Sequence, residues 1–441
     1  MSQSESGRGQ QLYRRAKELI PGGTQLLSKR PEMFLPDQWP SYYQRAKGAE
    51  VWDLDGRRLL DCGYHGIGAC ALGYGDPDVD AAVIEAIRQG STCTLNAPEE
   101  VALAERMVGL HPWADMARFT RAGGEALAVA IRIARTATRR AVVAFCGYHG
   151  WHDWYLAANL GETSALDGHL LPELRPAGVP RPLAGTAVPF HYNKLEELEA
   201  IVAEHGDTLA AIVMEPVRSQ DPAPGFLEGV RAIADRVGAV LIFDEVTSGW
   251  RLSVGGAHLV YGVSPDMAVF AKAISNGYPL GAVIGRRAVM TAAQDTFISS
   301  TAWTERVGPV AALATIDKME RLNLPAMLVA AGTKVQRGWQ AAADAAGLGI
   351  AISGIAPLAH LGFTQGDPLV MKTLFVQEML DRGFLATTAF YATAAHDDSV
   401  LDPYLAAVGE VFAVMAEAFK TGDAEQRLRG PVAHGGFRRL T

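Results

Sequence analysis

Three side chains with reactive chemistry follow apolar runs in the middle of the chain. Asp244 and Glu245 come directly after the run 239–243, and Lys272 follows the run 267–271. Such runs predict buried parallel strands, whose carboxyl ends hold the ligands of open α/β sheets. An aspartate there can keep a pyridinium nitrogen charged, and a lysine can form a Schiff base with a cofactor aldehyde.

The same residues also have ordinary structural explanations. An acidic pair at a strand end is often a helix cap or a solvated turn, and a single lysine is usually a surface charge. The upstream sequence is therefore needed to distinguish a functional site from an ordinary structural turn.

Strand-like and helix-like segments alternate from residue 120 to residue 285, which predicts an α/β fold with a mostly parallel central sheet. Gly123 and Gly124 precede a helical segment at 126–135, and two glycines at a helix start form a phosphate site, although such pairs also occur without a ligand. The aromatic run 147–154 follows a predicted strand at 141–145 and is expected to form a pocket wall, with core packing as the alternative.

The remaining elements predict two further regions. Asp55-Gly56 lies between two short strands and predicts a hairpin within an N-terminal segment, 1–75, that packs with a small C-terminal domain. That small α+β domain, 326–441, has helices predicted at 368–382 and 403–420, the second capped by Asp402. The large central domain then covers 76–325.

Composition limits the possible partners and compartments. The formal charge of −8 over 441 residues gives no basic patch for nucleic acid. Four cysteines lack zinc-site spacing, so we expect no metal and four buried thiols in a reducing compartment. The polar residues 1–11 contain no signal region, and no run approaches the roughly 20 apolar residues of a membrane span. These features predict a cytoplasmic protein without a membrane partner.

Ordered motifs over nearly the whole chain resemble the class III aminotransferases, pyridoxal-phosphate enzymes of fold type I, and most closely the branch that contains glutamate-1-semialdehyde aminomutase. The motifs are Pro21-Gly22-Gly23, Val51-Trp52-Asp53-Leu54-Asp55-Gly56, Tyr148-His149-Gly150, Glu215-Pro216, Gly225-Phe226-Leu227, Phe243-Asp244-Glu245-Val246 and Ala271-Lys272. The resemblance implies the fold type I architecture, a large domain with a mostly parallel sheet plus a smaller α+β domain, and pyridoxal 5′-phosphate as cofactor.

The resemblance assigns catalytic roles to two residues. Lys272 would carry the cofactor as a Schiff base and move the proton between the substrate Cα and the cofactor. Burial beside the cationic ring would lower its pKa for the second task. Asp244 would pair with the pyridine nitrogen and keep it protonated.

The resemblance also implies the cofactor contacts. Val246 and Tyr148 would cover the two faces of the ring, with His149 next to Tyr148 in the same motif. Glu215 would join the polar network beside the ring. Gly123 and Gly124 would bind the phosphate through backbone N–H groups, because the preceding Ala122 offers no hydroxyl.

A residue of a second subunit completes the implied site. Thr301, with Thr304 as the alternative, would reach the phosphate of the neighbouring subunit. This arrangement implies a homodimer with two shared active sites. Small molecules, an amino donor and an oxo acceptor, would be the other partners.

The sequence departs from the aminomutase pattern where the substrate would bind. Tyr391 follows Phe390 in place of a glutamate, and Trp303 replaces part of a Ser-Gly-Asn-Pro run. Arg30 is a candidate for the carboxylate-binding arginine, and Trp151 would help shape the pocket. These departures favour an aminotransferase over an intramolecular aminomutase. A racemase or epimerase on the same scaffold is a further alternative, and a non-catalytic relative is disfavoured because Lys272 and Asp244 are both present.

Overall fold

The computed structural model describes residues 7–162, 164–169 and 174–435. Its internal contacts divide the chain into two compact units. One unit joins the two ends of the sequence, Met1–Asp76 and Ala326–Thr441, and the other is the continuous segment Pro77–Pro325. We call them the terminal unit and the central unit.

A seven-stranded sheet forms the middle of the central unit, in the order β4-β10-β9-β8-β7-β5-β6. The five strands from β9 to β6 are mutually parallel, and β10 runs antiparallel to both of its neighbours. The prediction of a mostly parallel α/β sheet is therefore confirmed. The bounds are β4 Met116–Thr120, β5 Val142–Cys146, β6 Ala187–Pro189, β7 Leu209–Met214, β8 Val240–Asp244, β9 Met267–Phe270 and β10 Gly281–Gly285.

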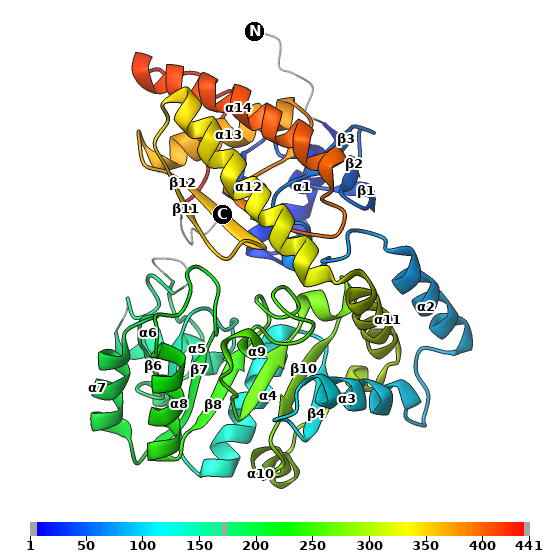
Figure 1. Cartoon of the computed structure of the whole chain (residues 1–441), viewed down its shortest axis with the longest axis vertical. Helices are drawn as coiled ribbons and strands as arrows, with labels where there is room; N and C mark the ends of the chain where they lie inside the picture. Colours follow the sequence, from blue (N-terminus) through cyan, green and yellow to red (C-terminus); the bar gives the residue numbers. More distant parts are fainter. Residues whose placement is uncertain (1–6, 163, 170–173, 436–441) are drawn as a thin grey trace. The chain divides into compact units, whose positions relative to one another are not determined.

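Helices cover both faces of this sheet (Figure 1). Ile242 of β8 packs in the cluster that α4 (Gly123–Thr138) forms on one face. Its neighbours Leu241 and Phe243 pack with α7 (Leu195–His205) and α8 (Phe226–Val237) on the other face. Since β8 is buried on both sides, its sequence is continuously apolar up to Asp244.

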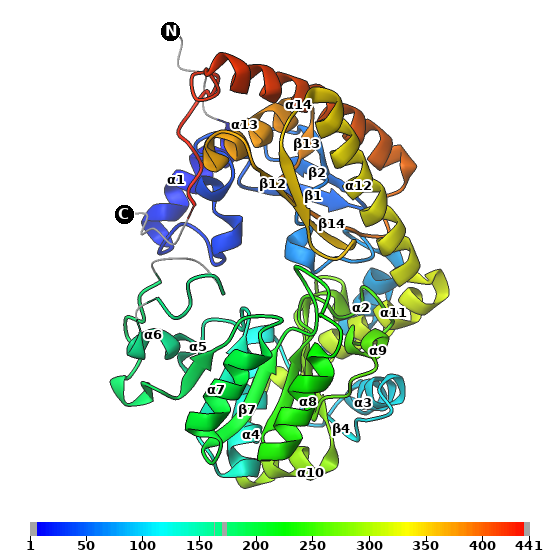
Figure 2. The same cartoon turned by 60° about the vertical axis from the view of Figure 1, so that its left-hand side comes forward.

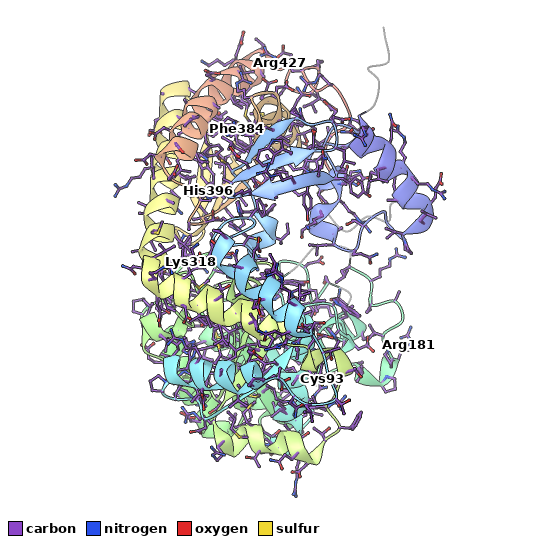
Figure 3. All side chains as sticks on the ribbon, turned by 90° about the vertical axis from the view of Figure 1, so that its right-hand side faces the viewer. Cys93, Arg181, Lys318, Phe384, His396 and Arg427 are labelled. Carbon is purple, nitrogen blue, oxygen red and sulfur yellow. The ribbon has the colours of Figure 1, made fainter. Side chains whose placement is uncertain are left out.

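The other helices of the central unit surround this three-layer core. Long ones are α2 (Pro77–Gln89), α3 (Pro98–Leu110) and α11 (Val307–Leu322), and Lys318 of α11 pairs with Asp78 of α2 at 3.2 Å (Figure 3). Short ones are α5 Asp153–Leu156, α6 Ala158–Gly161, α9 His258–Tyr261, α10 Arg287–Met290, η4 Arg181–Leu183, η5 Lys272–Ser275, η6 Thr291–Asp295 and η7 Thr301–Thr304, whereas η3 Gly66–Gly68 belongs to the terminal unit.

The terminal unit contains two small sheets, in the orders β1-β2-β3-β13 and β11-β12-β14 (Figure 2). β2 and β3 are antiparallel around Asp55-Gly56, which confirms the predicted hairpin. The strands are β1 Tyr43–Lys47, β2 Glu50–Asp53, β3 Arg58–Asp61, β11 Ile350–Ser353, β12 Leu358–Phe363, β13 Phe384–Leu385 and β14 Ala389–Tyr391. The helices are α1 Arg8–Leu19, η1 Leu27–Lys29, η2 Pro31–Met33, α12 Leu324–Ala346, α13 Pro368–Asp381 and α14 Asp398–Thr421.

The predicted start of the last helix was wrong. α14 begins at Asp398, and the Asp397 side chain caps it by accepting from the Ser399 N–H at 2.9 Å. Pro403 therefore lies inside the helix, and Asp402 pairs with Lys334 of α12 instead of capping. By length and composition α14 could cross a membrane, with a mean hydropathy of 1.4, but half of that window is buried, as in core helices of soluble proteins.

The expectation of four buried thiols was also wrong. Cys62 and Cys146 are buried and Cys70 is partly buried, but Cys93 is exposed in the segment between α2 and α3 (Figure 3). An exposed thiol has no packing role, so the cysteine pattern alone did not predict burial.

Candidate active site

Asp244 ends β8 and is almost completely buried. Its Oδ1 accepts from the Val246 backbone N–H at 3.0 Å, and its Oδ2 lies 2.7 Å from Nδ1 of His149. The other ring nitrogen of His149, Nε2, donates to the Cys146 carbonyl at 3.0 Å. The two ring nitrogens of His149 thus connect the Asp244 carboxylate to the backbone at the end of β5.

Lys272 follows β9, the strand next to β8. Its φ of +51° is in the left-handed region, a strained conformation for a residue with a side chain and one that clusters at functional sites. Burial lowers the pKa of Lys272 to about 8, and the positive charge of Arg218 acts in the same direction. The charges of Glu215 and Asp244 act against this shift. Roughly a tenth of this amine is therefore uncharged at pH 7, far more than for an ordinary lysine.

Thr247 contacts the amine directly. The Nζ of Lys272 donates to Oγ1 of Thr247 at 2.8 Å, and the Thr247 side chain is buried. The Thr247 carbonyl accepts from Nε of Arg251 at 2.7 Å, which holds the turn after β8 in place. Sequence reasoning missed Thr247, although it lies three residues after Asp244.

Gly123 and Gly124 are the first two residues of α4. A Cβ at Gly123 would lie 3.0 Å from Cγ1 of Val246, and one at Gly124 would lie 3.1 Å from the His152 ring. The Glu125 carboxylate accepts from the backbone N–H groups of Arg121 and Ala122 at 3.0 and 3.1 Å. The glycine N–H groups of the first turn have no partner within the helix and can bind an anion.

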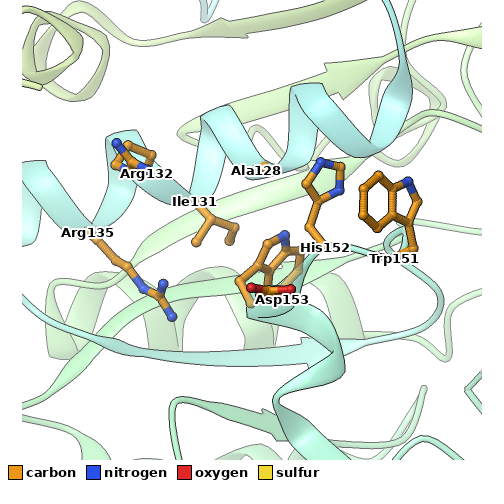
Figure 4. A pocket seen from close by; sticks show the side chains of 8 residues that line it. Ala128, Ile131, Arg132, Arg135, Trp151, His152 and Asp153 are labelled. Carbon is orange, nitrogen blue, oxygen red and sulfur yellow. The ribbon is translucent and has the colours of Figure 1, made fainter. Parts of the chain in front are cut away.

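The residues of the aromatic run after β5 lie in three different environments. Tyr148 is half-exposed and lines a cavity with Glu215, which agrees with the expected pocket wall. Trp154 packs in the core, which was the alternative. His152 lies against Gly124, while Trp151 is 69% exposed at the edge of a second cavity along α4, of about 330 Å³ (Figure 4).

Glu215 follows β7, on the other side of β8 from Lys272. It is buried, and its Oε1 accepts from Nη1 of Arg218 at 3.1 Å. Its Oε2 is buried and has no hydrogen-bond partner among the described residues. A buried carboxylate oxygen without a donor is costly, so this atom indicates a missing ligand group.

Thr301 and Thr304 are both exposed in η7. Arg121 holds this turn beside the start of α4, because its Nη2 donates to the carbonyls of Trp303 and Glu305 at 2.9 and 2.7 Å. Trp303 lines a cavity of about 220 Å³ on the flank of α4. Within this chain, neither Trp303 nor Trp151 lines the cavity next to Glu215.

Two predicted substrate residues, Arg30 and Tyr391, belong to the terminal unit. The Arg30 guanidinium lies against Gly22, where a side chain would clash with it. Tyr391 is buried in β14, with its ring 5.3 Å from that of Tyr64.

The central unit's cluster fits pyridoxal phosphate. The first turn of α4 offers N–H groups for the phosphate, and Asp244 offers a carboxylate for the ring nitrogen. Val246 and Tyr148 are available to cover the ring, and the unpartnered Glu215 Oε2 can accept from a bound polar group. Among the residues that the structure describes, no group of His, Cys, Asp and Glu could hold a metal ion.

Comparisons with known proteins give consistent matches. The family described as "Aminotransferase class-III" matches residues 36–350. The chain is 33% identical to 3-aminobutyryl-CoA aminotransferase of Cloacimonas acidaminovorans over 377 residues, which cover 83% of this chain and 86% of the relative. It is 34% identical to glutamate-1-semialdehyde 2,1-aminomutase of Syntrophobacter fumaroxidans over 430 residues, 92% of this chain and 97% of the relative.

A solved structure has the same fold. The FumI protein of Sphingopyxis sp. MTA144, in its PLP internal aldimine form, superposes with a TM-score of 0.84 at 26% identity. The superposition covers 94% of this chain and 98% of that protein.

Proposed function

The chain belongs to the class III aminotransferase family, and we propose how its residues carry out pyridoxal-phosphate-dependent transfer of an amino group from a donor to an oxo acceptor. The bound cofactor supplies an aldehyde that takes up the amino group and a ring that accepts an electron pair. The observation that carries this proposal is the position of Lys272, a strained, partly uncharged amine on the strand next to Asp244.

Each residue of the cluster then has one task. Lys272 holds the cofactor aldehyde and, when released, moves a proton at the substrate Cα, for which a pKa of about 8 is well suited. Asp244 would keep the ring nitrogen protonated, and His149 would orient the Asp244 carboxylate through their hydrogen bond. Gly123 and Gly124 bind the phosphate, Val246 and Tyr148 pack on the ring, and Glu215 bonds beside it.

Borohydride reduction tests the role of Lys272. Reduction of the holoenzyme should attach the cofactor covalently to the peptide that contains Lys272, as seen by mass spectrometry. Lys272→Ala should lose this label and all turnover but stay folded, whereas Lys318→Ala, on α11, serves as the matched control and should keep both. Label on a different lysine would refute the assignment.

A second candidate reaction is intramolecular amino transfer, because one relative is an aminomutase. The two reactions differ in the fate of the donor. An aminotransferase consumes a separate donor and leaves the enzyme in its aminated form, while an aminomutase rearranges one substrate without net donor consumption. Cofactor absorbance after addition of a donor panel, followed by an acceptor screen, separates them.

We also propose a homodimer in which Thr301 binds the phosphate in the partner's site. The proposal is supported by the exposed position of Thr301 and by the Arg121 bonds that fix η7 next to the start of α4. Thr304 is less suited, since its Oγ1 already donates to the Thr301 carbonyl at 2.9 Å. Trp151 and Trp303 would then lie near the subunit interface, and Arg30 and Tyr391 remain candidates for substrate contacts.

Complementation tests the shared site. Lys272→Ala and Thr301→Val chains are refolded together, so that one site of each heterodimer receives both wild-type residues and the other site receives both lesions. Activity should therefore recover relative to each variant alone. If mass spectrometry proves heterodimers but activity stays absent, Thr301 acts within its own chain.

The remaining proposals concern the setting of the enzyme. We propose that it works in the cytoplasm with small-molecule partners only, without nucleic acid or a membrane. The acidic net charge and the unpaired cysteines support this setting. We further propose that the central unit is the large cofactor-binding domain and that the terminal unit combines the N-terminal segment with the small domain.

A further inference from the structure

The cavity that Tyr148 and Glu215 line has a volume of about 330 Å³ and opens at the ends of β5 and β7. Four rings form much of its wall, those of Tyr148, His169, His191 and Tyr192. Arg218 lies on the same wall and bonds to Glu215. Tyr148 and Glu215 also belong to the proposed cofactor cluster, but Arg218 has no task in the proposed chemistry.

Arg218 lies close enough to influence the reacting amine. Its charge is the largest charge effect that lowers the pKa of Lys272, while Glu215 acts in the opposite direction. Arg218 is half-buried and follows β7 in the segment after Glu215. The wall of the cavity thus includes two residues, Glu215 and Arg218, whose charges act on the amine, although Lys272 itself does not line the cavity.

Arg218 is the cation that the described wall offers to a ligand. His169 accepts from the Gly147 N–H through Nδ1 at 3.2 Å, and burial lowers its pKa to about 4, so its ring is neutral. The ring and backbone N–H of His191 are both bonded to Glu197. A guanidinium presents a planar fork of N–H donors that matches a carboxylate.

We propose that this cavity binds the non-reacting arm of the substrate and that Arg218 binds a carboxylate at the end of that arm. The ring-lined wall would pack against the carbon chain, and the unpartnered Oε2 of Glu215 would accept from a hydroxyl or ammonium group of the ligand. A bound carboxylate would share or replace the bond from Arg218 to Glu215. This inference rests on the proposed aminotransferase function and specifies its substrate class as anionic.

Matched donors of equal chain length test the charge preference. The half-reaction is followed by cofactor absorbance with 4-aminobutyrate and 5-aminovalerate against butylamine and pentylamine. The wild type should favour the carboxylated donors. Arg218→Gln should raise KM for the carboxylated donors about 10- to 100-fold relative to the plain amines, because a charged hydrogen bond is lost, whereas a change in the pKa of Lys272 affects both donor classes equally. Arg218→Lys, which keeps the charge without the fork, should be intermediate.

A control variant and a second measurement make the test specific. Arg236→Gln removes an exposed arginine of α8 that pairs with Glu199, and it should change neither donor class. Calorimetric titration of the holoenzyme with glutarate, which has no amino group to react, should show weaker binding by about 10- to 100-fold in Arg218→Gln. This readout does not depend on turnover.

The outcomes separate this inference from the proposed function. If no donor of either class changes the wild-type cofactor absorbance, the aminotransferase proposal fails, and the glutarate titration still decides the role of Arg218. If the wild type favours plain amines, or if Arg218→Gln leaves glutarate affinity and the preference for carboxylated donors unchanged, the carboxylate site is refuted.

Discussion

Asp244 and Glu245 are neighbours in the chain, and both are buried carboxylates paired with a histidine. The two pairs differ in the hydrogen-bond partners of that histidine. Nε2 of His258 accepts from the Trp113 indole N–H at 2.9 Å, so its single ring proton is on Nδ1 and is donated to Glu245 at 2.7 Å. The other oxygen of Glu245 accepts from the Ser248 hydroxyl at 2.8 Å. Every group of this pair is satisfied by a neutral histidine.

The pair of Asp244 and His149 is different, because both ring nitrogens of His149 lie next to acceptors, the Asp244 carboxylate and the Cys146 carbonyl. The contrast continues along the turn, where Ser248 bonds Glu245 but Thr247 bonds the amine of Lys272. The side of the turn with Glu245 and Ser248 is therefore a closed structural network, and the other, open side, with Asp244 and Thr247, belongs to the proposed cofactor site. We expect substitutions on the two sides to affect different measurements.

The largest expected effect is on the open side. Asp244→Asn removes the charge that keeps the ring nitrogen protonated, so the half-reaction should slow by orders of magnitude, each 1.36 kcal/mol of lost stabilisation being about tenfold. Cofactor affinity should fall as well. Stopped-flow absorbance measures the rate, and thermal unfolding should show that the apo-protein remains folded. A near-normal rate would mean that Asp244 is as structural as Glu245.

A smaller loss of rate is expected from His149→Phe. The hydrogen bond to the Asp244 carboxylate is worth about 1.5–3 kcal/mol as a charge-assisted bond, so the half-reaction should slow about 10- to 100-fold. As a positioning residue, His149 should also influence the pH dependence of the cofactor absorbance, which a merely structural residue would not. His258→Phe is the matched control, and we expect it to lower stability without altering that pH dependence.

These two sides were only partly predictable from the sequence. The apolar runs predict β8 and β9 because strands that are buried on both faces must be continuously apolar, and this places Asp244 and Lys272 on adjacent strand ends. The direction of each side chain after the strand ends depends on the turn, so the roles of Thr247 and Arg218 were missed. α12 was also missed, although Pro325 follows its first residue, a position at which proline starts a helix instead of ending one.

A substitution on the closed side should lower the stability of the protein and leave the reaction rate nearly unchanged. Glu245→Gln keeps the shape and an acceptor for His258 but loses charge-assisted bonds, so the free energy of unfolding should fall by about 1–2 kcal/mol, with the half-reaction rate within a few-fold of wild type. Denaturant unfolding measures the first quantity. A large loss of rate would show that the Glu245 network also controls the chemistry.

The pH dependence of stability at acid pH gives a second test of this prediction. Burial opposes ionisation of Glu245, but hydrogen bonds from the ring and backbone of His258 outweigh it, so its pKa is lowered in the folded protein. The resulting stabilisation is complete above the unfolded pKa of about 4.3 and is lost as the pH falls through the lower folded value. The difference between wild type and Glu245→Gln should therefore shrink below about pH 4.

The smallest expected effect tests Thr247, the residue of the open side that touches the amine. Its Oγ1 accepts from Lys272, and an acceptor favours the charged amine, so Thr247→Val should lower the pKa of Lys272 further below its wild-type value of about 8. A hydrogen bond of about 1 kcal/mol corresponds to a shift of roughly 0.7 pH units. The reaction of the apo-enzyme with an amine-selective reagent, measured by mass spectrometry of the Lys272 peptide across pH, gives this midpoint without turnover.

Thr247→Ser restores the hydroxyl and should restore the midpoint, whereas Ser248→Ala, on the closed side, should leave it unchanged and lower stability instead. The half-reaction of Thr247→Val should change only a few-fold, since a shift of roughly 0.7 units alters the fraction of free amine by at most about fivefold. If Thr247→Val and Ser248→Ala shift the midpoint equally, the amine responds to general loosening of the turn. In that case the alternation of open and closed sides along Asp244, Glu245, Thr247 and Ser248 does not control the reactivity of Lys272.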